Sequence, residues 1–475
     1  MRKWILALML ISIAARAGAY TIPYETWLGA YVNDTKVGYL SFKITKAEFE
    51  GVQGYKVENY VSNHLMVLGA ELTQVVTSFI YTDDKLNPLA EEFMVTSGGK
   101  SMTVSARFGK ESIECIVSAG SGTSKKSIPI PKGTSLVGDA MFATLDSVPK
   151  VGDKYLLHYF NPLTLAIDDL DVKVESQEKM TVGGKEYDTF KITNSSPMGD
   201  MTVWQQADGD VVKVSAMMGI TMLRQTKDEA KSGIENTGED FAVMTSIKAD
   251  KRIENPRGVK LLDVILVGLT DSKMAITDKR QVTTKARGMK DAVRFRIKTV
   301  GADAKKSIDR PVGGDEFKDM LASTPYVDHE VGTIKAQAAE IVGNEKNAYT
   351  ACSKIRAWIH DNVQVRADIG ITRSASDVLK SRVGVCRDYA ILFAALARSV
   401  GIPAKVASGV LYLNGGFYYH AWVECYVGEW VPFDATLTSD FVDATHIKLA
   451  EGDAATMFGL AKVIGSLRAE IKGYK

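Results

Sequence analysis

The chain has too few cysteines for a scaffold held together by disulfide bonds, with only four among 475 residues. Charge of one sign is not in excess either, because 58 Lys and Arg residues stand against 57 Asp and Glu residues. A formal net charge of +1 gives no chain-wide attraction to nucleic acid or to anionic lipid. The paired Cys or Cys/His spacings of a structural zinc site are missing. We therefore expect no nucleic-acid partner, no metal and no other cofactor.

Long apolar runs are also absent, except for one at the start of the chain. A positive start at Arg2 and Lys3 precedes an apolar stretch over residues 4–15, and small residues follow at 17–19. About a dozen residues are short for a membrane span, which needs ~20. The pattern predicts a secretory signal peptide over 1–19, with an N-terminal membrane anchor as the alternative. We expect an exported protein, periplasmic or secreted, with no transmembrane span after cleavage and an oligomeric state that the sequence does not indicate.

What remains has the composition of a globular protein that is too long for one core. Hydrophobic residues make up 45% of the chain, and domains usually span ~100–200 residues. Over 20–226, alternation such as Leu40 and Phe42 around polar neighbours predicts an antiparallel β-rich domain, barrel-like or a curved sheet. The charged segment 227–240 indicates a linker, and 241–310 indicates a second, small β domain. No family is recognisable in this β-rich region.

The pattern changes to helix followed by sheet from about residue 325. Apolar residues at helical spacing predict helices near 334–341 and 349–359. Another helix is expected to open at Cys386 and to stop at Gly401, with a proline two residues beyond. Strands are expected at 405–413, 418–427 and 430–433. This arrangement is an α+β layout.

Cys386 is the strongest candidate for a nucleophile because it stands at the start of its expected helix. Unpaired amide groups and the positive end of the helix dipole stabilise a thiolate there. The same N–H groups can also stabilise an oxyanion during acyl transfer. Cys386 is therefore expected to attack an acyl carbon.

His420 and Asp434 are the candidate partners of this thiol, with His420 moving the proton and Asp434 orienting the imidazole. A hairpin turn centred on Gly428 would pair Val423 with Phe433. His420 and Asp434 would then lie on one face as diagonal neighbours, ~7–8 Å apart at the backbone. A turn centred half a residue later would place them on opposite faces. The register of the hairpin therefore decides whether a catalytic triad can form.

Several motifs occur in a fixed order around these three residues. They are Gly384-x-Cys386-Arg387-Asp388-Tyr389-Ala390, Leu396-x-Arg398-x-x-Gly401-Ile402-Pro403, His420-Ala421-Trp422-Val423-Glu424 and Trp430-x-x-x-Asp434-x-Thr436. With them, residues 325–446 resemble the transglutaminase-like superfamily, whose catalytic domain is papain-like with the order Cys–His–Asp. The fold class expected is thus α+β, with a papain-like catalytic domain preceded by antiparallel β-rich domains. Residues 447–475 would be a C-terminal extension packing on the catalytic domain.

The resemblance implies thiol acyl chemistry on protein or peptide amides, through a thioester, as a peptidase or an amine acyltransferase. We expect a protein or peptide substrate, with the cell envelope as one source. Trp422 and Tyr419 are candidates for substrate binding, although packing beneath the hairpin is the alternative for Trp422. The rival function is a catalytically inactive cell-envelope binding or assembly factor that uses the domain as a scaffold, suggested by the size of the β-rich region.

Overall fold

The computed structural model describes residues 14–15, 22–32, 34–67, 70–119, 122–138, 143–144, 149–216, 219–235, 240–301, 304–366, 372–439 and 441–475. The described chain divides into an N-terminal unit that ends at Phe241 and a C-terminal unit that begins at Ala242. The predicted signal peptide, 1–19, lies outside the described residues except for Ala14–Ala15 (β1), which pairs with Ala143–Thr144 (β11). Among the described helices, none is long and apolar enough to cross a membrane.

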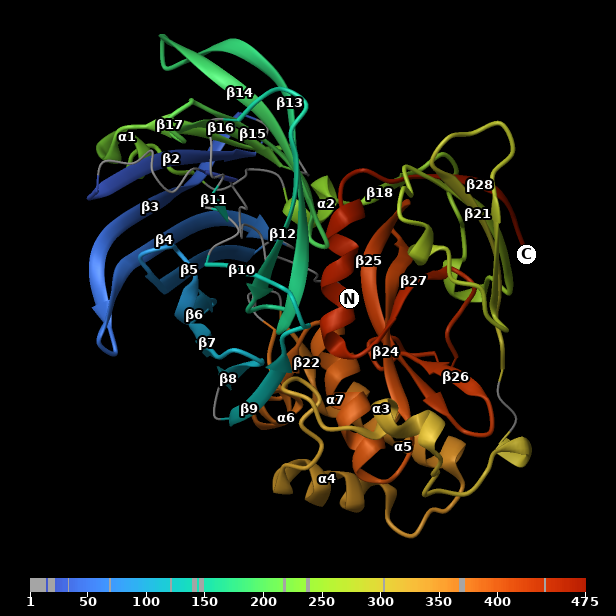
Figure 1. Ribbon diagram of the computed structural model, residues 1–475. Helices are drawn as coiled ribbons and strands as arrows, with labels where there is room; N and C mark the ends of the chain where they lie inside the picture. Colours follow the sequence, from blue (N-terminus) through green and yellow to red (C-terminus); the bar gives the residue numbers. More distant parts are fainter. Residues whose placement is uncertain are drawn as a thin grey trace. The chain divides into compact units, whose positions relative to one another are not determined.

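The N-terminal unit is built on one 15-stranded sheet with the order β10-β12-β13-β14-β15-β16-β17-β2-β3-β4-β5-β6-β7-β8-β9 (Figure 1). Neighbouring strands from β12 through to β8 in this order are antiparallel, whereas β10 and β12 are parallel. Alternation along β3 buries Leu40 and Phe42, as the sequence predicted. The strands are β2 (Tyr24–Val32), β3 (Thr35–Phe49), β4 (Val52–Val67), β5 (Ala70–Asp83), β6 (Pro88–Ser97), β7 (Lys100–Phe108), β8 (Ser112–Ala119), β9 (Gly122–Pro129), β10 (Leu136–Val137), β12 (Lys154–Asn161), β13 (Ala166–Val182), β14 (Lys185–Ser196), β15 (Gly199–Gln205), β16 (Val211–Ala216) and β17 (Ile220–Gln225).

The segment 227–240, expected to be a linker, begins with a capped helix that belongs to the N-terminal unit. Helix α1 (Lys227–Lys231) starts with a capping box in which Thr226 and Glu229 bond each other's backbone N–H groups. Its two lysines lie over the ring of Trp27, at 5.3 and 4.8 Å from the centroid. Two of the charged residues that suggested a linker, Lys227 and Lys231, therefore contact the sheet.

The C-terminal unit contains a nine-stranded sheet with the order β20-β21-β19-β28-β18-β25-β24-β27, and β26 pairs with β25. Its strands are β18 (Ile247–Ala249), β19 (Leu261–Val267), β20 (Gln281–Lys285), β21 (Ala292–Lys298), β24 (Ala404–Leu413), β25 (Gly416–Tyr426), β26 (Trp430–Phe433), β27 (His446–Gly452) and β28 (Arg468–Tyr474). A separate two-stranded sheet pairs β22 (Gln364–Val365) with β23 (Val383–Gly384).

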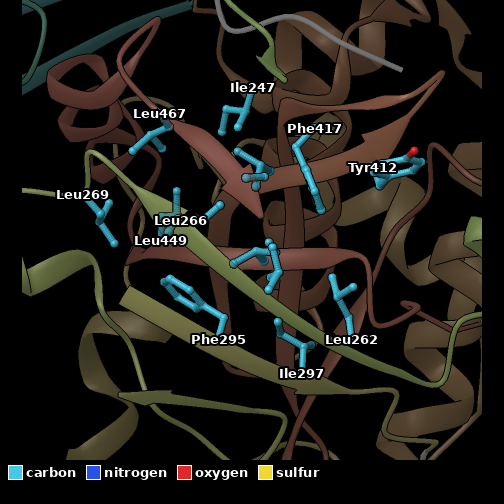
Figure 2. Packing of buried hydrophobic residues seen from close by; sticks show 14 of the residues in the cluster. Ile247, Leu262, Leu266, Leu269, Phe295, Ile297, Tyr412, Phe417, Leu449 and Leu467 are labelled. Atoms are coloured by element: carbon cyan, nitrogen blue, oxygen red, sulfur yellow. The ribbon is translucent and has the colours of Figure 1, made fainter. Parts of the chain in front are cut away.

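This sheet differs from the expectation of a separate small β domain over 241–310. Strands β18–β21 come from that segment, yet they share a sheet with β24 and β25. One apolar core joins them: Figure 2 shows Phe295 of β21 packed in the same cluster as Phe417 of β25 and Leu449 of β27. The expected C-terminal extension is likewise part of the sheet, because β28 lies between β19 and β18. Burial of shared apolar side chains thus makes one body of three segments.

The helices of the C-terminal unit confirm the sequence periodicity. The α-helices are α2 (Phe241–Met244), α3 (Lys318–Leu321), α4 (Gly332–Val342), α5 (Ala348–Asn362), α6 (Ala375–Ser381) and α7 (Cys386–Ser399). Short 3₁₀ segments lie at Pro256–Gly258, Ser272–Met274, Ala304–Lys306, Asp315–Phe317 and Ala454–Val463. Helix α7 packs against β24 and β25 and against α4, α5 and α6 (Figure 1). The chain leaves α7 through Gly401, whose φ of 74° is readily adopted by glycine.

Candidate active site

Cys386 is the first residue of α7, where the sequence analysis placed it. The Asp388 carboxylate accepts a 2.9 Å hydrogen bond from the Val385 backbone N–H and so closes the first turn. Arg373 Nη2 lies 3.2 Å from the same carboxylate. Gly384 permits this close approach, since a Cβ there would lie 2.7 Å from the Asp388 Cβ. The thiol is therefore held at a helix N-terminus whose first turn is closed by Asp388.

The hairpin register is the one that places His420 and Asp434 together. Val423 pairs with Phe433 across β25 and β26, which corresponds to a turn centred on Gly428. His420 Nε2 then lies 2.7 Å from Asp434 Oδ2, within hydrogen-bond distance. The other carboxylate oxygen accepts bonds from the Thr436 N–H at 2.8 Å and from the Thr436 hydroxyl at 2.6 Å. Asp434 is thus held at both oxygens.

Burial and charge act in opposite directions on this pair. Burial alone would lower the pKa of the His420 imidazole, but the Asp434 carboxylate and the Cys386 thiol raise it to about 9. Burial would likewise raise the pKa of Asp434, but the imidazoles of His420 and His446 hold it well below its usual range. The geometry therefore favours an ionised Asp434 beside a protonated His420.

The Cys386 thiol lies close enough to His420 to act on it by a hydrogen bond and by its charge. Asp434 faces Nε2 of His420, which leaves Nδ1 as the other ring nitrogen. Among the described residues, this Nδ1 has no partner that meets strict hydrogen-bond geometry. Contacts between nucleophile and base are often loose in the absence of substrate. The structure thus brings Cys386, His420 and Asp434 into one electrostatically connected group.

This group is closed off from solvent. Cys386 is 0% exposed, His420 1% and Asp434 4%. A low-dielectric setting strengthens the interactions among the three side chains. It also means that a peptide cannot reach the sulfur without movement of the surrounding chain.

His446 is a fourth member of this group that sequence reasoning missed. Its Nε2 lies 3.2 Å from Asp434 Oδ2, the same oxygen that faces His420. His446 opens β27 and pairs with Leu411 of β24, the strand next to β25. No motif or spacing signalled this contact, because it depends on the order of strands in the sheet.

The two residues proposed for substrate binding lie on opposite faces of β25. Tyr419 belongs to the apolar core, where its hydroxyl donates a 2.8 Å hydrogen bond to the Val463 carbonyl. Its prediction as a pocket residue is wrong, because neighbours in a strand point to opposite faces and His420 takes the active-site face. Trp422 shares the His420 face, stacks on it with 6.2 Å between centroids, and is edge-on to His446 at 5.4 Å. Its indole is 1% exposed and packs against the imidazoles.

Two groups of side chains bring potential metal ligands together. His420, Asp434 and His446 place three ligand atoms within 4.8 Å of one another, but imidazole–carboxylate contacts of 2.7 and 3.2 Å account for this spacing. Asp278, Glu424 and Glu451 form the second group, and the buried ammonium of Lys448 lies among them at 2.5 to 3.0 Å. Hydrogen bonds and ion pairs explain both groups.

Comparison with known proteins agrees with this geometry. Residues 335–435 match the transglutaminase-like superfamily. An uncharacterized protein of Mycobacterium leprae (strain TN) is 27% identical over 131 residues, which cover 26% of this chain and 46% of that protein. The chain thus spans under half the length of that curated relative.

Two solved structures are similar to this chain at low identity. A proposed cysteine protease from Cytophaga hutchinsonii is 20% identical, covering 46% of this chain and 86% of its own, with a TM-score of 0.31. A proposed protease from Parabacteroides distasonis ATCC 8503 is 13% identical, covering 75% of this chain and 69% of its own, with a TM-score of 0.20.

Proposed function

We propose that this chain, whose residues 335–435 form a transglutaminase-like domain, is an exported thiol enzyme acting on amide bonds of proteins or peptides. The observation that carries the proposal is the 2.7 Å contact between His420 Nε2 and Asp434 Oδ2, next to a thiol at a helix N-terminus. Export is inferred from the apolar segment at 4–15. The packing of α7 against antiparallel β24 and β25 supports a papain-like catalytic domain.

The chemistry would proceed in two stages. The Cys386 thiolate attacks the amide carbonyl carbon and forms a C–S bond, while His420 gives its proton to the departing amine as the C–N bond breaks. Water or a second amine then attacks the thioester, His420 takes a proton from it, and the thiolate leaves. Asp434 keeps the imidazole oriented in both stages. Water as the second nucleophile makes a peptidase, and an amine makes an acyltransferase.

Labelling and turnover together test this proposal. Iodoacetamide would be applied to the full chain between pH 6 and 9, and labelling at each cysteine followed by peptide mass spectrometry. Cys386 should react faster than Cys352, a buried thiol on α5 that serves as an internal comparison. Casein and a primary-amine probe would report hydrolysis and amine transfer separately, with Cys386→Ala as the control. Equal labelling of both thiols, without turnover that depends on Cys386, would refute the enzyme assignment.

The burial of Cys386 favours a second candidate function, an inactive envelope-binding or assembly factor. A sulfur that is 0% exposed cannot meet a peptide in this conformation. The scaffold role predicts that His420→Ala and Cys386→Ala leave the biological phenotype of the protein unchanged. Loss of that phenotype in either variant, with folding retained, would instead favour the enzyme.

A further inference from the structure

The buried polar group extends beyond the three predicted residues. His446 is 0% exposed, and its two ring nitrogens face two different acidic residues. Nε2 lies 3.2 Å from Asp434 Oδ2, and Nδ1 lies 3.2 Å from the Asp443 carbonyl oxygen and 3.5 Å from its carboxylate. The imidazole is therefore held between Asp434 and Asp443.

Asp443 is itself held firmly. One carboxylate oxygen accepts hydrogen bonds from the N–H of Thr445 at 2.8 Å and from its hydroxyl at 2.5 Å. The other lies 2.7 Å from Nη1 of Arg257, in an ion pair. Burial alone would raise the pKa of Asp443, but His446, Arg257 and Thr445 lower it to about 2. A side chain with so many partners is a rigid anchor for His446.

Arg257 belongs to the segment 241–310, for which the sequence predicts a separate small β domain. Its Nη2 donates to the Tyr412 carbonyl at 2.7 Å and to the Thr445 hydroxyl at 3.0 Å. Arg280, from the same segment, donates through Nη1 to the His446 carbonyl at 2.8 Å and through Nη2 to the Asp443 carbonyl at 2.5 Å. The chain that precedes the transglutaminase-like domain thus supports the active site directly.

The charged and titratable groups that face His446 come from several elements. Asp434 follows β26, Asp443 precedes β27, and His420 of β25 has its ring centroid 5.6 Å away. The guanidinium of Arg257 contacts the Asp443 carboxylate, and that of Arg280 contacts the Asp443 carbonyl. Removal of His446 would therefore change mainly what Asp434 contacts, while Asp443 keeps its other partners.

We propose that His446 is a positioning residue of the active site, which shares the Asp434 carboxylate with His420 and so fixes the geometry and proton affinity of His420. The inference rests on the proposed function and adds a fourth residue to it. His420 Nε2 and His446 Nε2 both face Asp434 Oδ2, so each hydrogen bond to this oxygen weakens the other. Without His446, the carboxylate can turn about its Thr436 contacts, and its charge acts on His420 alone.

Two substitutions separate the effects. In His446→Leu we expect kcat for Cys386-dependent turnover to fall about 10-fold with KM almost unchanged, because orientation and not binding is lost. The basic limb of the pH profile should move to higher pH, since the unshared carboxylate stabilises the His420 imidazolium more strongly. His446→Gln keeps an N–H donor toward Asp434. This variant should recover most of kcat, and the basic limb of its pH profile should return to its original pH.

A readout independent of turnover completes the test. The His420 imidazole would be titrated by NMR in the unmodified full chain, in His446→Leu and in His329→Leu, a matched change at a half-buried histidine outside this group. His446→Leu should raise the titration midpoint of His420, and the control should leave it unchanged.

The outcomes distinguish the two proposals. An unchanged His420 midpoint together with an unchanged kcat per folded molecule would overturn the role of His446, even if thermal stability fell. Absence of Cys386-dependent turnover in the unmodified chain would instead overturn the proposed function, while a shifted midpoint would still establish the coupling of His446 to His420.

Discussion

Val423 of β25 pairs with Phe433 of β26, and this pairing decides the face on which each active-site residue lies. Side chains alternate along a strand, so a slip of one residue would move Asp434 to the face opposite His420. In the observed register, a 2.7 Å contact joins the two side chains.

Asp434→Asn should lower Cys386-dependent turnover by about 100-fold or more. The asparagine oxygen can keep the bonds from Thr436, so its NH₂ group would face His420 Nε2. The amide NH₂ and a proton on His420 Nε2 would then both be donors, so the imidazole would favour the tautomer without a proton on Nε2, which is the wrong one for catalysis. Steady-state kinetics would measure the loss, and Asp319→Asn, at an exposed residue, is the matched control. Full activity in Asp434→Asn would remove Asp434 from the mechanism.

Activity should fall as the pH rises through about 9, because the pKa of His420 is raised to that value. The same shift affects stability. A histidine whose folded pKa exceeds its unfolded value of ~6.5 stabilises the fold fully below that value, and the contribution is lost as pH rises through about 9. Turnover and chemical denaturation measured from pH 6 to 10 would test both. A basic limb below pH 7 would contradict the charged state of His420.

Lys448→Met should destabilise the C-terminal unit by about 3–5 kcal/mol. The ammonium is 2% exposed and lies 2.6 Å from Asp278, 2.9 Å from Glu424 and 2.5 Å from Glu451. Its removal leaves three carboxylates beside one cation, Lys405, which lies 3.4 Å from Glu424 and 2.8 Å from Glu451. Urea unfolding would measure the change.

The control for this variant is an exposed ion pair. Lys472 lies 2.7 Å from Glu470 with side chains 39% and 35% exposed, so Lys472→Met should cost about 1 kcal/mol or less. Equal effects at both lysines would mean that burial does not govern these pairs.

Reagent size should control access to Cys386, since the sulfur is 0% exposed. Relative to free cysteine, a bulky maleimide should label Cys386 far more slowly than iodoacetamide does, because a larger reagent requires a wider opening. Mass spectrometry of each cysteine would give both rates. Urea below its denaturing concentration should raise the labelling rate of the maleimide before it raises that of iodoacetamide. Labelling rates that do not depend on reagent size would show that the site is open in solution.

Several parts of this protein could be predicted from local sequence pattern. The stop at Gly401 correctly marked the end of α7, and the strands predicted at 405–413 and 418–427 match β24 and β25 within one or two residues. The helix start at Cys386 and the two possible hairpin registers were also readable, because caps, periods and turns depend on neighbours in the chain. The orientation of Tyr419 also follows from local pattern, since it adjoins His420 in a strand and so points to the opposite face.

The sequence by itself thus determined the helices and strands, the thiol at a helix start and the residues able to serve it. Only the tertiary structure decided which register the hairpin takes, that 241–310 joins the catalytic sheet, and that His446 contacts Asp434. It also decided that the Lys448 ammonium contacts three carboxylates and that Cys386 is buried. These features depend on strand order and on burial between segments far apart in the chain, which no local period encodes.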